Sequence, residues 1–202
     1  MNKQLFEEFL HVQGNAIEEI GFSAAKLHEN VGQTYDSVHP YGFHLSMVAD
    51  AAMKYGHEVI AEENDILPVI FAAYYHDSIE DARLSYNRVM EAALRFMSPE
   101  QAYIAAEIVY ALTNDKGRTR SERAGSRYYL GIRNTPYACF VKLCDRLANM
   151  SYSFNGTNAS NYHMHEVYAS EWPHFIEALT VASEDSRFLL PKDMIHEIEM
   201  LF

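Results

Sequence analysis

The sequence predicts an all-α protein, a single bundle of about eight to ten helices. Apolar residues recur at the three-to-four spacing of helices in segments from both halves of the chain. The clearest such segments are 5–10, 66–75, 89–96 and 104–112. The period-two alternation typical of half-buried strands is missing. With 49% hydrophobic and 22% charged residues, the composition indicates a globular protein with a sizeable core.

Two helix starts and several loops can be located from the sequence. Residues 98–101 read Ser-Pro-Glu-Gln, which predicts a capping box with proline in the first turn of a helix. Thr135 and Pro136 repeat the combination of cap and proline. Pro173 interrupts a helical segment and predicts a kink or a new helix start there. Loops are expected at Gly32, 64–65, Gly117 and 155–158.

The chain is expected to form one domain, residues 1–202, because its length fits a single core and no repeat or linker divides it. No apolar run reaches the roughly 18 residues that indicate a membrane span. Segment 1–10 also lacks the apolar core of a signal peptide. We therefore expect a cytoplasmic protein that does not act at a membrane, and a homo-oligomer remains open. Cys139 and Cys144 have no partner motif and are expected to be buried thiols.

The net charge of −12 argues against a nucleic-acid partner, because such proteins need basic surface to displace counterions. A phosphate-bearing substrate would need local basic groups to overcome this field. Five of the 16 basic residues lie between 116 and 127, in a segment expected to be a loop that enters a helix near Ser121. Within it, Lys116 and Arg123 are candidates to contact phosphate. For Arg118 and Arg120 a plain solvated loop is an equal alternative.

A run of metal-binding and proton-handling groups stands at residues 76–81, which read His-Asp-Ser-Ile-Glu-Asp. We expect this run on two turns of one helix, where Asp77 shares a face with both Glu80 and Asp81. Carboxylates crowded beside the His76 imidazole repel one another, and a bound cation would relieve that repulsion in a buried segment. An ordinary solvated turn is the alternative explanation for Glu80 and Asp81.

Two other segments supply partners for this run. His44 opens an apolar helical stretch, and Asp145 lies in an apolar run with Asn149 one turn later on the same side. An aspartate inside an apolar helix is seldom buried without a partner. We therefore expect two imidazoles and two carboxylates from three segments to surround one divalent cation. The four expected metal ligands are His44, His76, Asp77 and Asp145.

A shell of histidine and carboxylate ligands differs from the thiolate cage of structural zinc and from the all-oxygen cage that suits calcium. It suits Mn, Fe, Co or Zn. An ion of this kind lowers the pKa of a bound water molecule to about 7 and polarises a phosphoryl oxygen. The residues therefore predict the hydrolysis of a phosphate ester or anhydride.

Four short motifs occur in order along the chain. They are Pro40, Tyr41 and His44; then His76, Asp77, Glu80 and Asp81; then Thr113, Asn114, Asp115 and Lys116; and finally Lys142, Leu143, Asp145, Leu147 and Asn149. Their order and spacing resemble the HD superfamily. Within it they are most similar to the hydrolase domain of the RelA/SpoT family, which includes small alarmone hydrolases and metazoan SpoT homologues. The resemblance extends from about residue 22 to about residue 180.

The resemblance implies an HD-domain helical bundle that removes the 3'-pyrophosphate from guanosine tetra- or pentaphosphate. It implies that manganese is held by the four expected ligands. Glu80 and Asp81 match the pair that positions the water and handles protons in that family. Lys116 and Asn149 match positions that contact the substrate, and Tyr168 resembles the aromatic residue of the last shared helix. For Asn149, a role in holding the ligands in place is an equal alternative.

The chain also departs from the family pattern. Glu29 stands where the family usually has a basic residue before the Pro-Tyr motif. A carboxylate repels phosphate and cannot stack on a base as a guanidinium does. Asn114 replaces a frequent acid in the third motif. Two alternatives to an alarmone hydrolase therefore stay open: an HD phosphohydrolase acting on another nucleotide or phosphoester, and a non-catalytic regulatory module that retains the metal.

Overall fold

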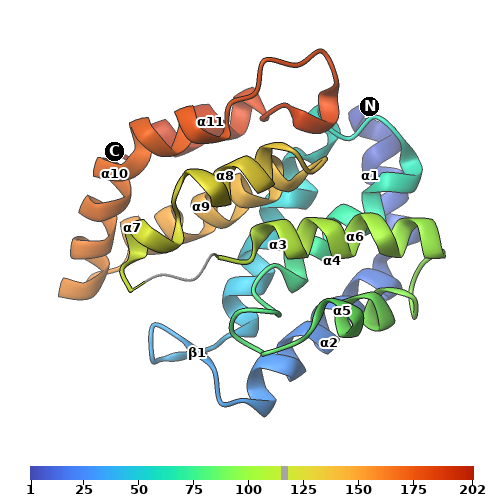
Figure 1. Cartoon of the computed structure of the whole chain (residues 1–202), viewed down its shortest axis with the longest axis horizontal. Coiled ribbons are helices and arrows are strands. Elements are labelled where there is room, and N and C mark those ends of the chain that lie inside the picture. Colours follow the sequence, from blue (N-terminus) through green and yellow to red (C-terminus); the bar gives the residue numbers. More distant parts are fainter. Residues whose placement is uncertain (115–117) are drawn as a thin grey trace.

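The computed structural model describes residues 1–114 and 118–202 and is built almost entirely of helices (Figure 1). The α-helices are α1 (Lys3–Val12), α2 (Gly14–Asn30), α3 (Gly42–Tyr55), α4 (Ile66–Tyr75), α5 (Tyr86–Ala93), α6 (Pro99–Leu112), α7 (Arg120–Arg123), α8 (Ser126–Arg133), α9 (Ala138–Asn155), α10 (Ala159–Leu179) and α11 (Lys192–Glu199). Three 3-10 turns, η1 (Gly56–Glu58), η2 (Glu63–Asp65) and η3 (Ser186–Phe188), join them. All helices except α7 have eight residues or more, and the all-α prediction is confirmed.

Helix α4 is the central element of the bundle. Its sequence is apolar on every side, and each of its ten residues is buried. A helix that is hydrophobic all round can only be accommodated inside a protein, so α4 is surrounded by neighbours. It packs against α2, α3, α6 and α9, and α3 in turn packs against α9 (Figure 1). The C-terminal end of α4 therefore delivers residue 76 to the interior of the molecule.

Helices α9 and α10 form one wall of the bundle, in which α9 also packs against α3, α4 and α6. They pack along one another and are joined by Arg146, which is only 7% exposed. Both terminal nitrogens of its guanidinium lie 3.0 Å from Glu171 Oε2. The guanidinium carbon also lies 4.7 Å from the ring centroid of Tyr168 and 4.2 Å from that of Phe175. A buried guanidinium requires such pairing, because an unpaired charge in the interior is costly.

A small antiparallel ribbon precedes α3, formed by β1 (Thr34–Tyr35) and β2 (His39–Pro40). Asp36 and Ser37 in its turn have φ angles of 51° and 56°, in the left-handed region that tight turns require. This ribbon was not predicted, because strands of two residues are too short to show alternation.

The predicted helix starts have different outcomes. The capping box at Ser98 is confirmed: Gln101 N donates to Ser98 Oγ at 3.3 Å, and Ser98 N donates to Gln101 Oε1 at 3.1 Å. The start predicted at Thr135 is wrong, because Thr135 Oγ1 donates back to Gly131 O at 3.0 Å and so closes α8. Helix α9 begins only after Tyr137. Helix α10 runs through Pro173 without a new start.

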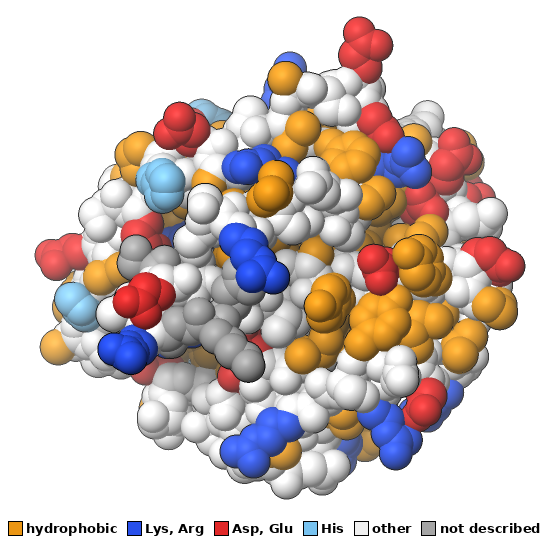
Figure 2. All heavy atoms as spheres, in the orientation of Figure 1, with side chains coloured by type: hydrophobic (Ala, Val, Ile, Leu, Met, Phe, Trp, Pro, Cys, Tyr) orange, Lys and Arg blue, Asp and Glu red, His pale blue; other side chains and the backbone are white. Residues whose placement is uncertain are grey.

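Both cysteines are free and buried, as expected. Within the parts of the chain that the structure describes, we find no helix with the length and apolar character needed to cross a membrane. Figure 2 shows acidic and basic side chains interspersed over one face, with hydrophobic side chains gathered on its right-hand side, where α6 lies in Figure 1. Two of the exposed hydrophobic residues of α6 are Tyr103 and Tyr110, which are 56% and 60% exposed.

The capping box allows a test of the fold. We expect Ser98→Ala to lower the free energy of unfolding by about 1 kcal/mol, because the backbone N–H of Gln101 loses its acceptor. Urea denaturation followed by circular dichroism measures this change. The Ser98→Asp variant keeps a side-chain acceptor and should stay near the wild-type value. Equal losses in both variants would show that the cap is not the cause.

Candidate metal centre

Four side chains from three parts of the chain converge at the inner end of α4. His44 lies in the first turn of α3, His76 and Asp77 directly follow α4, and Asp145 lies in the middle of α9. Asp145 Oδ1 is 3.4 Å from His44 Nε2 and 3.9 Å from His76 Nε2. Asp77 Oδ2 is 2.9 Å from His76 Nε2 and 3.8 Å from His44 Nε2. The structure thus brings together all four side chains that the sequence nominated as ligands.

The segment that carries the second motif is not the helix we expected. Helix α4 ends at Tyr75, and residues 76–80 form turns. The turn nevertheless keeps one helix-like bond, because Asp81 N donates to Asp77 O at 2.8 Å. The acids therefore stay close to the cluster. The expectation of two full helical turns was wrong, since the spacing of the motif fits a tight turn equally well.

The histidine rings are oriented in a way that fits a metal ion. His76 is 3% exposed, and its Nδ1 lies 2.9 Å from Ala73 O. With a proton on Nδ1, the ring would donate to this carbonyl and leave Nε2 as a lone-pair donor. Nε2 is buried and has no hydrogen-bond partner among the described residues, although Asp77 lies close by. One ligand atom each from His44, His76 and Asp145 lie within 4.8 Å of one another. Two imidazoles and two carboxylates match the donor set of a divalent transition-metal ion.

Tyr41 and His28 support this cluster from the side of α2. The Tyr41 hydroxyl donates to Asp77 Oδ2 at 2.5 Å. The His28 ring stacks on the Tyr41 ring, with centroids 4.4 Å apart and an interplanar angle of 12°. Burial lowers the pKa of His28 to about 4, so this ring is neutral near pH 7 and does not oppose a cation. His28 was missed as a site residue, because a single histidine on a helix gives no signal of its own.

Asp145 is held by two further groups on α9. Lys142 Nζ lies 2.9 Å from Asp145 Oδ2, and Asn149 Nδ2 donates to Asp145 Oδ1 at 2.6 Å. Burial by itself would raise the pKa of Asp145, but the Lys142 ammonium and the neighbouring imidazoles hold it well below its usual range. The pKa of Lys142 is raised in turn: burial lowers it, and the Asp145 carboxylate more than compensates. Asp145 is therefore an ionised carboxylate at neutral pH.

Glu80 and Asp81 lie beside the cluster, on the same turn. Asn114 Nδ2 donates to Glu80 Oε1 at 2.9 Å and so orients this exposed carboxylate. Gln33 Nε2 lies 3.3 Å from Asp81 Oδ2. Burial and then the charge of Asp77 raise the pKa of Asp81, which favours proton uptake by this group. Asp81 differs in this respect from Asp77, whose pKa is strongly lowered by His76 despite burial.

The cluster lies at a cavity of about 670 Å³ that also borders α8 and α10. Its described lining includes five carboxylates and three basic side chains, and the bases are Arg123, Lys142 and Arg146. Lys142 and Arg146 are already paired with Asp145 and Glu171. A divalent cation would offset the excess of two negative charges. An anionic ligand is therefore expected to bind here only once the cation is present.

The residues predicted to contact a substrate have mixed outcomes. Arg123, Asn149 and Tyr168 line the cavity, with Tyr168 packed on the Arg146 guanidinium. Both ends of the Asn149 amide are engaged, by Tyr35 and Asp145, which favours the positioning role over substrate contact. Lys116 lies outside the described residues. Several other aromatic residues of the lining were missed because they occur outside the four motifs; they are Tyr35, Tyr128, Tyr129, His174 and Phe175.

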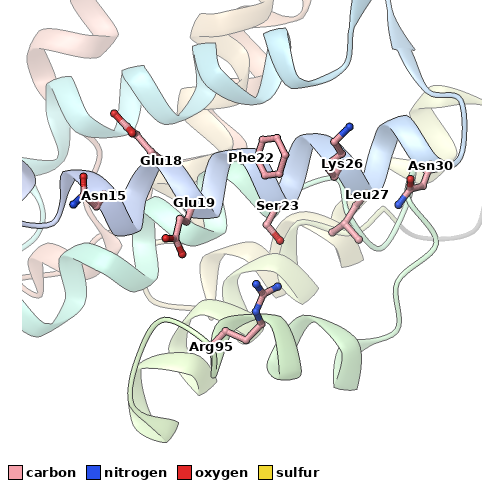
Figure 3. A pocket seen from close by; sticks show the side chains of 9 residues that line it. All are labelled: Asn15, Glu18, Glu19, Phe22, Ser23, Lys26, Leu27, Asn30 and Arg95. Carbon is pink, nitrogen blue, oxygen red and sulfur yellow. The ribbon is translucent and has the colours of Figure 1, made fainter.

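A second, more open cavity of about 750 Å³ lies along α2, with Arg95 on its opposite side (Figure 3). It is larger than the cavity at the cluster, but its lining includes none of the four converging ligands. Glu18, Glu19 and Lys26 extend from α2 around its edge, and Phe22 is 68% exposed. We therefore place the chemistry of the protein in the smaller cavity.

The charge on His76 predicts a pH dependence of the metal-free protein. Burial alone would lower the pKa of His76. The Asp77 and Asp145 carboxylates outweigh this effect and raise the pKa from its ordinary 6.5 to about 9. The folded state thus holds this proton more tightly than the unfolded state. Its stabilisation is complete below pH 6.5 and is lost as the pH rises from 6.5 through 9. We expect the free energy of unfolding, measured in urea with a chelator, to fall over this range.

The His76→Gln variant should lose this component and show a smaller fall between pH 6.5 and 9. His11→Gln, which changes an exposed histidine of α1, is the matched control and should behave like the wild type. An equal fall in the wild type and in His76→Gln would contradict the assignment of the proton to His76.

Comparisons with known proteins agree with this fold. No model of a known protein family matches the sequence, and no curated protein sequence matches it. A solved structure is similar, described as a metazoan orthologue of SpoT that hydrolyses ppGpp and plays a role in starvation responses. The similarity covers 92% of this chain and 93% of the other, with a TM-score of 0.60 and 19% sequence identity. At this identity the comparison establishes a shared fold, so this chain has the helical architecture of a SpoT-type hydrolase.

Proposed function

We propose that this protein is a cytoplasmic, metal-dependent phosphohydrolase that removes pyrophosphate from the 3' position of ppGpp or pppGpp. The observation that carries the proposal is the convergence of two buried imidazoles and two partly buried carboxylates beside one cavity, with two further acids on its wall. The fold shared with a structure described as hydrolysing ppGpp supports the choice of substrate. One domain spanning residues 1–202 would contain the whole site.

His44, His76, Asp77 and Asp145 would hold the divalent ion in this proposal, and Mn²⁺ is the first choice because the resemblance to the RelA/SpoT hydrolase domain implies it. When bound, the ion supplies Lewis-acid activation of water and of the phosphoryl group. Fe, Co and Zn are accepted by the same donors. The neutral His28 and the Tyr41 hydroxyl would keep Asp77 in place.

Glu80 and Asp81 would handle the proton of the attacking water. Water attacks the phosphorus attached to the ribose 3' oxygen, the bond between them breaks, and pyrophosphate leaves while the 3' oxygen takes a proton. Asp81 suits proton uptake because its pKa is raised by burial and by Asp77. Glu80 is held toward the cavity by Asn114. Arg123, together with Lys116, would contact the phosphates, and Tyr168 would form part of the opposite wall.

A second candidate is hydrolysis of a different nucleotide or phosphoester by the same groups. Two of the three basic side chains of the described cavity lining are paired with carboxylates, which leaves little positive charge for a substrate with four or five phosphates. Glu29 adds no positive charge, because it is a carboxylate; it lies at the surface and pairs with Lys26 at 2.5 Å. This candidate differs from the first in the substrate and not in the chemistry.

The test is product release from a panel of nucleotides with added Mn²⁺. We expect pyrophosphate from guanosine tetraphosphate. We further expect Glu80→Gln to lower kcat by about 10²- to 10⁴-fold, because a positioned acid or base contributes an effect of that size. Calorimetry should show Mn²⁺ binding unchanged in this variant. Glu100→Gln, an exposed acid in the first turn of α6, serves as the matched control and should keep full activity.

Each other outcome of this assay selects a different function. Turnover of another nucleotide, with none of guanosine tetraphosphate, would select the second candidate. Absence of turnover on the whole panel, despite bound Mn²⁺, would reject both candidates in favour of a metal-binding regulatory module.

A further inference from the structure

The ribbon before α3 holds a tyrosine, Tyr35, against the cluster of proposed metal ligands. Tyr35 ends β1, and Val38 N donates back to Tyr35 O at 3.2 Å across the turn. The turn itself is tied to α9, because the Tyr152 hydroxyl donates to Asp36 Oδ2 at 3.0 Å. The edge of the Tyr152 ring also meets Tyr35, with centroids 4.8 Å apart at 65°. The Tyr35 side chain is therefore fixed by contacts on both sides of the turn.

The Tyr35 ring covers the imidazole of His44. The two rings are nearly parallel, at 8°, with centroids 4.8 Å apart. A metal-binding histidine is usually oriented by a hydrogen bond to its second ring nitrogen. His76 has such a contact with Ala73, but His44 Nδ1 is buried and has no hydrogen-bond partner among the described residues. The stacked Tyr35 ring supplies the orientation that a hydrogen bond would otherwise give.

The Tyr35 hydroxyl acts on a second ligand through Asn149. It donates to Asn149 Oδ1 at 3.0 Å, which fixes the amide so that its nitrogen faces Asp145. Asn149 Nδ2 donates to Asp145 Oδ1 at 2.6 Å and to Asp145 O at 2.9 Å. The same oxygen, Asp145 Oδ1, lies 3.4 Å from His44 Nε2. One tyrosine thus contacts one ligand directly and orients another through a single amide.

We propose that Tyr35 is a positioning residue that aligns His44 and Asp145 for metal binding, so that the ribbon β1–β2 controls the affinity and geometry of the metal site. The inference rests on the proposed function only in taking these two side chains as metal ligands. Neither the order of the four motifs nor their residues assigns a role to Tyr35.

Two variants separate the two contacts. Tyr35→Phe keeps the ring over His44 and removes the hydroxyl bond to Asn149, so we expect Mn²⁺ affinity to fall by about 5-fold, the effect of one hydrogen bond. Tyr35→Leu removes both contacts, and we expect a loss of about 10- to 100-fold, as for other groups that orient metal ligands. Isothermal titration calorimetry of the full chain with Mn²⁺ measures both values.

A second readout distinguishes positioning from general stability. The visible absorption bands of the Co²⁺-loaded protein report ligand geometry, and we expect them to shift in Tyr35→Leu. Thermal unfolding of the metal-free variants checks that they fold. Tyr103→Leu, the same substitution at an exposed position of α6, is the matched control and should keep the wild-type affinity and spectrum.

Wild-type affinity together with a wild-type Co²⁺ spectrum in either folded variant would overturn the proposal. If Tyr35→Leu does not fold, Tyr35→Phe alone decides, and unchanged binding of Mn²⁺ would count against it. If the wild type itself binds no Mn²⁺, the proposed function fails and this inference fails with it. That result differs from the case in which the wild type binds and hydrolyses while Tyr35 is dispensable.

Discussion

Two partly buried carboxylates that must stay ionised are the constraint on which the rest of this structure depends. Asp77 and Asp145 lie at the inner end of an entirely apolar helix, where a negative charge is stable only beside a positive one. In the metal-free protein, the His76 imidazolium and the Lys142 ammonium provide that charge. A divalent ion would replace the proton on His76 and leave Lys142 in place. The site is thus arranged so that proton and metal compete for the same position.

The surrounding residues follow from this constraint. Tyr41 donates to one carboxylate, and Asn149 donates to the other. The His28 ring beside Tyr41 is neutral because burial lowers its pKa, so it adds no charge next to the cluster. Farther out, the cavity wall pairs Arg146 with Glu171 between two aromatic rings, so even the more distant charges are neutralised locally. Asp145 is oriented by the Asn149 amide, which is in turn oriented by Tyr35. The geometry of the cluster therefore depends on contacts between distant parts of the bundle.

The sequence predicted those features that depend on residue type and spacing. The apolar segment 66–75 became the buried helix α4, and the box at Ser98 became a helix cap. His44, His76, Asp77 and Asp145 were nominated by their place in an ordered set of motifs, and Asp145 also because an aspartate in an apolar run is seldom buried without a partner. Features that depend on tertiary contacts were not predicted. A local alternative was also missed: Thr135 closes a helix instead of starting one, because its hydroxyl donates to Gly131 O, four residues earlier. The contacts of Tyr35 depend on the three-residue connection between β1 and β2 and on Asn149, 114 positions away, for which local sequence carries no signal.

The buried thiol beside Asp145 has a consequence for the kind of metal and reagent that can reach this site. Burial, and then the adjacent carboxylate, raise the pKa of Cys144 well above its usual range, so the sulfur stays protonated. Thiolate is the form that attacks electrophiles and captures soft ions such as Cd²⁺ or Hg²⁺. Cys144 is therefore adjacent in sequence to the proposed ligand Asp145 but does not itself act as a metal ligand. Alkylating reagents are therefore expected to react with Cys144 only after the protein unfolds.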